Sequence, residues 1–161
     1  MATLPVEQML PTKFQPIAKR NFIFAIEGID YFLIKTASKP TIQTEEVAIN
    51  WMNSQRKIAG KTTFGTISVT MMEAIAPSAA QQVEEWRRLV HEQVSGRGGY
   101  ADFYKRDIQI KVTDPVGNII QQWELKGAFP TEVNYGELTM EGSDLGEISL
   151  TIAFDTFCLS Y

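Results

Sequence analysis

Hydrophobic and polar residues alternate along much of the chain, which is typical of β-strands that bury one face. The alternation is clearest in Glu147–Phe154, where apolar residues occupy every second position. Thr66–Met72 and Ile108–Thr113 show the same period, and Asn21–Glu27 is a short run rich in apolar and aromatic residues. The pattern predicts a mainly β protein whose strands are dry on one face and wet on the other.

Turn residues separate two pairs of these runs. Gly28 lies between Asn21–Glu27 and Ile29–Lys35, and this arrangement predicts a β-hairpin. Asp114–Asn118 combines Asp, Pro, Gly and Asn, which favour a turn, and it predicts a return into the strand Ile119–Lys126.

One segment, residues 78–95, has the period of a helix. Val83, Trp86 and Val90 fall on one stripe, while charged residues lie mostly off it. Ser78 and Gln81 have the spacing of a capping box at the start. We expect residues 1–161 to form a single domain, a small β-barrel or two-sheet sandwich with one helix on its outside.

Two segments do not fit a compact core. Residues 1–19 contain two prolines and are expected to form an extended N-terminal arm. Residues 40–63 form a long excursion with a weak strand pattern over Glu46–Trp51 and a predicted basic tip, residues 56–61. Such an excursion either packs on a partner or is an ordinary long hairpin packed on its own domain.

The composition argues against several classes of function. The formal net charge is −4, which argues against a basic nucleic-acid binder. Cys158 and His91 are the only residues of their kinds, so a disulfide framework and a two-histidine metal site are excluded. The longest apolar run, Phe22–Ile26, is far shorter than the ~20 residues of a spanning helix. We expect no enzyme, no cofactor, no metal and no membrane segment.

A series of short motifs then follows in a fixed order along nearly the whole chain. They are Arg20–Phe24, Trp51-Met52-Asn53, Arg56–Phe64, Ile67–Met71, the helix with Trp86, Glu124–Val133, and Glu147–Asp155. Together they resemble the major tail tube proteins of contractile-tailed bacteriophages.

This resemblance implies a structural subunit. Proteins of this kind form hexameric rings in which the strands of neighbours join into one ring-wide barrel around a channel. The rings stack into the inner tail tube, which the sheath protein surrounds and which meets baseplate and tape-measure proteins. DNA passes through the lumen without specific binding. The resemblance places the chain in the virion, after assembly in the bacterial host cytoplasm.

The resemblance also assigns residues. It implies contacts between subunits and between rings through the excursion of residues 40–63, with the candidates Trp51, Met52, Asn53, Arg56, Lys57, Ile58 and Lys61. Val83, Trp86 and Val90 are expected to anchor the helix to its own domain. Glu137, Glu141 and Glu147 are candidates for an acidic lumen surface.

Two other functions compete with this one. Within the same superfamily, the chain could be the inner tube or a baseplate-proximal tube protein of a contractile injection system or type VI secretion system. In a different class, it could be a monomeric β-barrel that binds a small apolar ligand, which requires an interior pocket.

Overall fold

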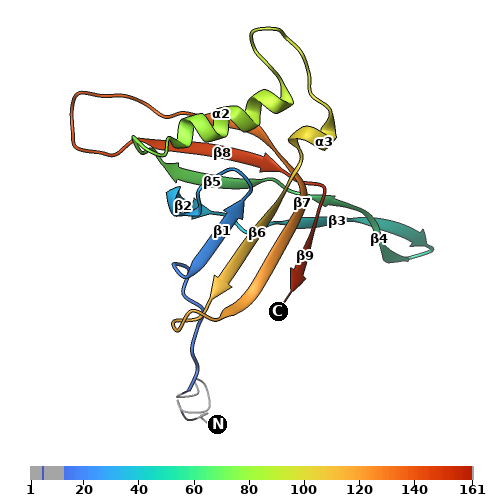
Figure 1. Cartoon of the computed structure of the whole chain (residues 1–161). Helices are drawn as coiled ribbons and strands as arrows, with labels where there is room; N and C mark the ends of the chain where they lie inside the picture. The colour runs from blue at the N-terminus through green and yellow to red at the C-terminus, as the bar shows by residue number, and fades with distance from the viewer. Residues whose placement is uncertain (1–4, 6–12, 161) are drawn as a thin grey trace.

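The computed structural model describes Pro5 and residues 13–160, so most of the arm expected over residues 1–19 lies outside the described residues. Strands dominate the described part (Figure 1). The elements in chain order are β1 (Phe22–Ile26), the 3-10 turn η1 (Tyr31–Leu33), β2 (Ile34–Ala37), β3 (Ile42–Trp51), β4 (Ser54–Phe64), β5 (Ile67–Met72), α2 (Ala79–Val90), α3 (Ala101–Tyr104), β6 (Arg106–Thr113), β7 (Ile119–Asn134), β8 (Glu147–Ala153) and β9 (Thr156–Ser160).

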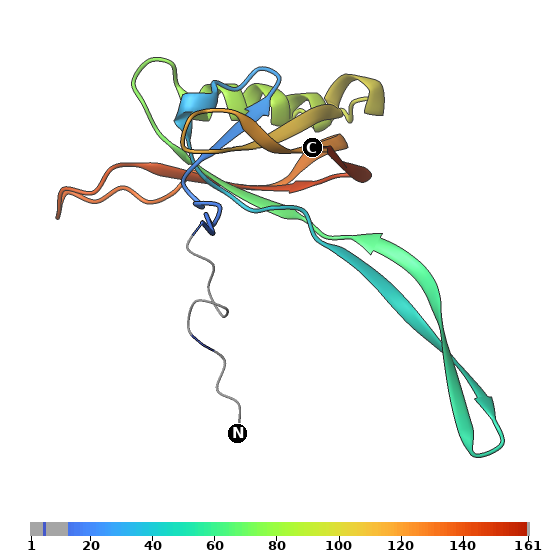
Figure 2. The same cartoon turned by 90° about the horizontal axis from the view of Figure 1, so that it is seen from below.

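The strands form a two-layer arrangement that the long strand β7 joins together. Hydrogen bonds link seven strands in the order β1-β6-β7-β8-β5-β2, with β9 also paired to β7. The first part of β7 pairs with β6 and β9, while Phe129–Asn134 pairs with β8. β7 therefore passes from one layer into the other, and Figure 2 shows the layers from the side. Over the described residues the sheet does not close into a barrel, so the sandwich is the form observed.

The core lies between these layers, on the faces that the alternation predicted. Ile67, Val69 and Met71 of β5 are at most 1% exposed. The apolar positions of β8 lie directly opposite them and are equally buried, because Ile148 pairs with Met71 and Ile152 with Ile67. The hydroxyl residues between them point away from the core, as the period of two requires.

Helix α2 closes one side of the core. Ser78 caps its start, since the Ser78 side chain accepts a hydrogen bond from the Gln81 backbone N–H at 3.4 Å. Its end differs from the expected range of residues 78–95: the helix stops at Val90. His91 is extended and pairs with Gly98, so the chain turns away, and Val94, inside the range expected to be helical, is 97% exposed.

The predicted hairpin between Asn21–Glu27 and Ile29–Lys35 is wrong. Gly28 does turn the chain, with φ +82°, but only one bridge, Ile26 with Ile29, follows it. The chain then enters η1 and crosses to the other layer, where β2 pairs with β5, while β1 pairs with β6. An alternating strand is apolar on one face whichever partner it takes, so the local pattern could not identify the neighbour.

Candidate assembly surfaces

Strands β3 and β4 form a two-stranded hairpin that projects from the sandwich (Figure 2). Every residue in the two strands is exposed except Gly60, which is partly buried. The hairpin occupies the excursion identified over residues 40–63, but it does not pack along the body of its own domain. A two-stranded ribbon is at best marginally stable alone in water. Its exposed residues make this ribbon a candidate surface for contact with another molecule.

The tip of the hairpin is apolar and not basic, which corrects the predicted basic tip. Trp51 pairs with Ser54, and Met52 and Asn53 form the turn between them. Met52 is 90% exposed and has a positive φ of 50°. Arg56, Lys57 and Lys61 lie along β4 instead, because the pairing places the turn before them.

The outer half of the hairpin has one apolar and one polar face. Residues directly opposite in an antiparallel pair share a face. The register pairs Val47 with Ile58, Ile49 with Arg56, and Trp51 with Ser54. These six residues define what we call the hairpin apolar face. Val47, Ile49, Ile58 and Trp51 are 46%, 49%, 52% and 70% exposed.

The opposite face is polar and internally paired. Lys57 Nζ lies 3.0 Å from Glu46 Oε1, and the Gln55 amide donates to Asn50 Oδ1 at 3.2 Å. Lys57 therefore lies on the other side of the ribbon from Trp51. Of Arg56 and Lys57, only Arg56 shares a face with the exposed apolar residues.

A bulge sets the direction of the hairpin apolar face. Between the pairs Thr44–Thr62 and Glu46–Ala59, β4 has one residue more than β3. An extra residue reverses the alternation beyond it. Ile58 and Phe64 thus lie on opposite faces although they are an even number of residues apart. Phe64 turns to the core, with its ring 6.0 Å from that of Phe154, while Ile58 faces outward.

The loop of residues 135–146, between β7 and β8, forms a second exposed surface. It lies at the opposite end of the molecule from the hairpin tip (Figures 1 and 2). Glu137 and Glu141 of the predicted lumen set are in this loop and are exposed. Glu147, the third member, begins β8 and pairs with Lys35. Sequence reasoning missed three exposed apolar residues here: Leu138, Met140 and Leu145 are 99%, 105% and 79% exposed.

The three residues expected to anchor the helix differ in burial. Val83 and Trp86 are fully buried, and the Trp86 indole N–H donates to the Tyr104 carbonyl at 2.7 Å. Arg106 lies over the Trp86 ring, 5.2 Å from its centroid. Val90, at the end of the helix, is only partly buried.

An ion-pair cluster ties α2 to the end of β7. Arg87 donates two hydrogen bonds to Glu84, at 2.9 and 2.6 Å, and the Tyr135 hydroxyl donates to the same carboxylate. The bonds from Arg87 and then from Tyr135 lower the pKa of Glu84 to about 2. Burial, followed by the bond to Glu84, raises the pKa of Tyr135. The cluster fixes the helix against the sandwich.

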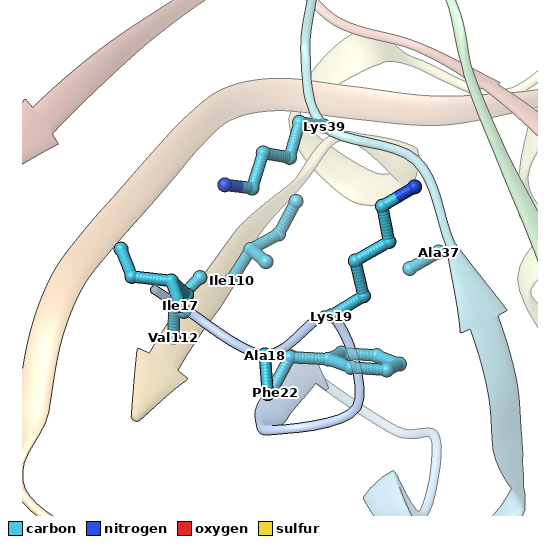
Figure 3. Close-up of a pocket in the computed structure, with 8 residues that line it drawn as sticks. All are labelled: Ile17, Ala18, Lys19, Phe22, Ala37, Lys39, Ile110 and Val112. Carbon is cyan, nitrogen blue, oxygen red and sulfur yellow. The ribbon is translucent and has the colours of Figure 1, made fainter. Parts of the chain in front are cut away.

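An apolar cavity of about 390 Å³ lies at the edge of the sandwich (Figure 3). Its lining comprises Ile17, Ala18 and Lys19, then Phe22, Ile110 and Val112 of β1 and β6, and Ala37 and Lys39. It lies beside the core, whose interior the buried side chains fill. A ligand-binding barrel needs its pocket in the interior, so this cavity gives that alternative little support.

The described residues also bear on the remaining candidate chemistry. Among Pro5 and residues 13–160, no three His, Cys, Asp or Glu side chains gather closely enough to hold a metal ion. Cys158 is a free cysteine and is exposed. No helix in this part of the chain is long and apolar enough to cross a membrane.

Comparison with known proteins decides the family. The family model described as T4-like virus tail tube protein gp19 matches residues 18–158. The chain belongs to this family. The resemblance seen in the sequence motifs is thereby confirmed.

Individual relatives agree with this assignment. The chain is 28% identical over 130 residues to the tail tube protein gp19 of Enterobacteria phage T4. This alignment covers 77% of this chain and 78% of the phage T4 protein. It is 26% identical over 113 residues to the tail tube protein of Serratia phage KSP90. That alignment covers 70% of this chain and 64% of the phage KSP90 protein.

Solved structures share the fold. The sheath/tube terminator of an extracellular contractile injection system, PVC, superimposes with a TM-score of 0.76 at 17% identity, over 93% of this chain and 100% of the other. The cap of the anti-feeding prophage gives 0.75 at 19% identity, over 91% and 92%. A chain of the PVC sheath-tube complex gives 0.69 at 17% identity, over 98% and 99%. At these identities the likeness concerns the fold alone.

Proposed function

We propose that this tail tube protein builds the wall of the inner tube of a contractile phage tail, as stacked hexameric rings. The observation that carries the proposal is the hairpin apolar face, which projects from a well-packed domain without cover. A monomer gains nothing from exposing Trp51, Ile49 and Ile58 together, whereas an assembled ring stack would bury them. Membership of the tail tube family supports a phage tail tube as the assembly that buries these residues.

Ring closure would also protect the open edges of the sandwich. β1 and β2 end the strand order, and β9 pairs only with β7 among the described strands. Such edges can pair with other chains in an uncontrolled way. Joining them to neighbours in a ring-wide barrel would satisfy their backbone groups and fix the number of subunits.

The outward face of β5 and β8 suits the wall of the channel. Ser68 lies opposite Thr151, and Thr70 lies opposite Ser149, so the middle of this face has hydroxyls and no charge. DNA phosphates would meet few cations there, and phosphate contacts with cations are what make binding strong. That Glu137, Glu141 and Glu147 line the lumen stays a prediction, and a basic channel surface in a density map would contradict it.

The remaining roles follow from the proposed tube. Its outer surface would meet the sheath protein, its ends the baseplate, and its lumen the tape-measure protein and then DNA, in a virion assembled in the host cytoplasm. We propose no catalytic activity, because the family and the phage T4 relative are tail tube proteins.

A second candidate function places the same fold in a contractile injection system and not in a phage tail. Structural neighbours from the PVC sheath-tube complex and the anti-feeding prophage baseplate support an inner tube or baseplate-proximal tube protein of a contractile injection system. Genes beside this one separate the two candidates: capsid and terminase genes indicate a phage, whereas toxin and ATPase genes indicate an injection system.

Negative-stain electron microscopy over a concentration series tests the proposed function. We expect hollow rings at low concentration and stacked rings or long tubes as the concentration rises. Gel filtration of the same samples provides the control. A protein that remains monomeric at every concentration, also when preformed tube fragments are added as seeds, would contradict the proposal.

A further inference from the structure

The two ends of the molecule differ in shape. The hairpin tip projects at one end, and the β7–β8 loop lies at the other (Figures 1 and 2). Residues of that loop line a hollow. The hollow has a volume of about 730 Å³, and its lining includes Met72, Leu145, Glu137 and Asp144. One end could therefore enter the other end of a second copy.

The hollow is both acidic and apolar. Glu147 in its lining pairs with Lys35, which leaves Glu137 and Asp144 as its uncompensated charges. Over the described part of the chain, neither of these two carboxylates lies within ion-pair distance of a cation. Beside them, Leu145 is 79% exposed. A partner that fits must offer an apolar group with a cation next to it.

The hairpin apolar face offers this combination. Trp51 and Arg56 line the same shallow pocket of the ribbon, together with Ile49 and Ser54. Lys57 is already paired with Glu46 on the other face. The outward surface near the tip therefore has one cation, Arg56, beside one large aromatic ring. Its charge is opposite to that of the hollow, and both surfaces have exposed apolar residues.

We propose that the hairpin apolar face of one copy seats in the β7–β8 hollow of a copy in the adjacent ring. Trp51 and Ile49 pack against Leu145 and Met72, and the Arg56 guanidinium pairs with Asp144 and Glu137. This inference rests on the proposed tube function and names the two surfaces that join one ring to the next. It also replaces the lumen prediction for Glu137.

The arrangement explains how a stack can grow without limit. The two surfaces lie at opposite ends of one chain, so the contact is head-to-tail and each added ring presents a fresh hairpin or a fresh hollow. Head-to-tail contacts that do not close on themselves produce open filaments.

Charge reversal and charge exchange test the pairing. Arg56→Asp and Asp144→Arg are each made alone and then together, and tube growth is measured by light scattering and negative-stain microscopy. Each single variant is expected to raise the critical concentration for stacking by at least about tenfold, because like charges across an interface repel. The double variant restores stacking, since its charges are complementary again.

Matched controls separate this effect from general changes in charge. Arg97 and Asp102 are exposed, lie outside both surfaces and form no ion pair among the described residues. Arg97→Asp and Asp102→Arg repeat the same substitutions and are expected to stack like the wild type. Circular dichroism confirms that each variant is folded.

Two outcomes would overturn the pairing. In one, the single variants stack like the wild type. In the other, both single variants fail but the double variant does not recover. In either case wild-type tubes in the same experiment leave the proposed function intact, whereas a wild type that never stacks would contradict the proposed function itself.

Discussion

Replacing Trp51 by alanine separates assembly from folding. Trp51 lies at the hairpin tip, 70% exposed, and its ring is absent from the buried core. Its removal should therefore change the free energy of unfolding of the monomer by less than about 0.5 kcal/mol, as is usual for surface positions. The cost should appear only when a partner surface covers the ring.

The size of that cost follows from area. A tryptophan buries about 150–250 Å² when fully covered, so the exposed part of Trp51 corresponds to about 140 Å². Allowing for the area that alanine still buries, about 110 Å² at about 25 cal/mol per Å² corresponds to about 3 kcal/mol per contact. Because 1.4 kcal/mol is a tenfold change, the loss of one contact per added subunit should raise the critical concentration roughly 100-fold, and the addition of whole rings would multiply this effect.

Sedimentation of assembled protein at increasing concentration measures this shift, with thermal unfolding of the dilute protein as the control for folding. Val116→Ala, in a turn outside both assembly surfaces and 86% exposed, provides the matched control. If the Trp51→Ala variant forms tubes at the wild-type concentration, Trp51 is not buried between subunits. If the Trp51→Ala variant instead loses about 3 kcal/mol in the unfolding of the monomer, the Trp51 indole stabilises the fold of its own chain.

Three further predictions concern the helix and its cluster. Trp86→Phe removes the indole N–H that bonds the Tyr104 carbonyl and should cost about 1–3 kcal/mol in urea denaturation, so a wild-type midpoint would argue against that bond. Ser78→Ala removes the N-cap and should cost about 1 kcal/mol, and an unchanged urea midpoint would contradict it. The pKa of Glu84 falls from 4.5 to about 2 on folding, so its stabilisation is present above pH 4.5 and disappears as the pH falls toward 2. Glu84→Gln should therefore flatten this acid limb, and an unchanged pH dependence would count against the Arg87 pairing.

The regular strands could be predicted because burial imposes their pattern. In β5 and β8 one face meets the core and the other meets water, so a period of two appears directly in the sequence. Ser78 and Gln81 likewise marked the start of α2, since capping depends on local spacing. The family resemblance added what these patterns do not contain, namely assembly into a tube.

The wrong predictions have physical causes. The partner of β1 depends on a crossing between layers that begins after Gly28, and no local pattern encodes it. The two faces of the β3–β4 hairpin were obscured because the bulge near Gly60 reverses the alternation in β4. A ribbon with no core of its own also lacks the burial that makes periodicity informative. The apolar residues of the β7–β8 loop were missed for the same reason, since they lie outside the core and no burial in their own domain gives them a period.

A density map of the assembled protein would show directly whether the hairpin apolar face joins subunits of a tube. Electron cryomicroscopy of tubes grown from the purified chain should show stacked six-fold rings in which Trp51, Ile49 and Ile58 are covered by a neighbouring subunit. Tubes in which the hairpin apolar face stays open to solvent, or a protein that forms no rings at all, would contradict the proposed role of this face.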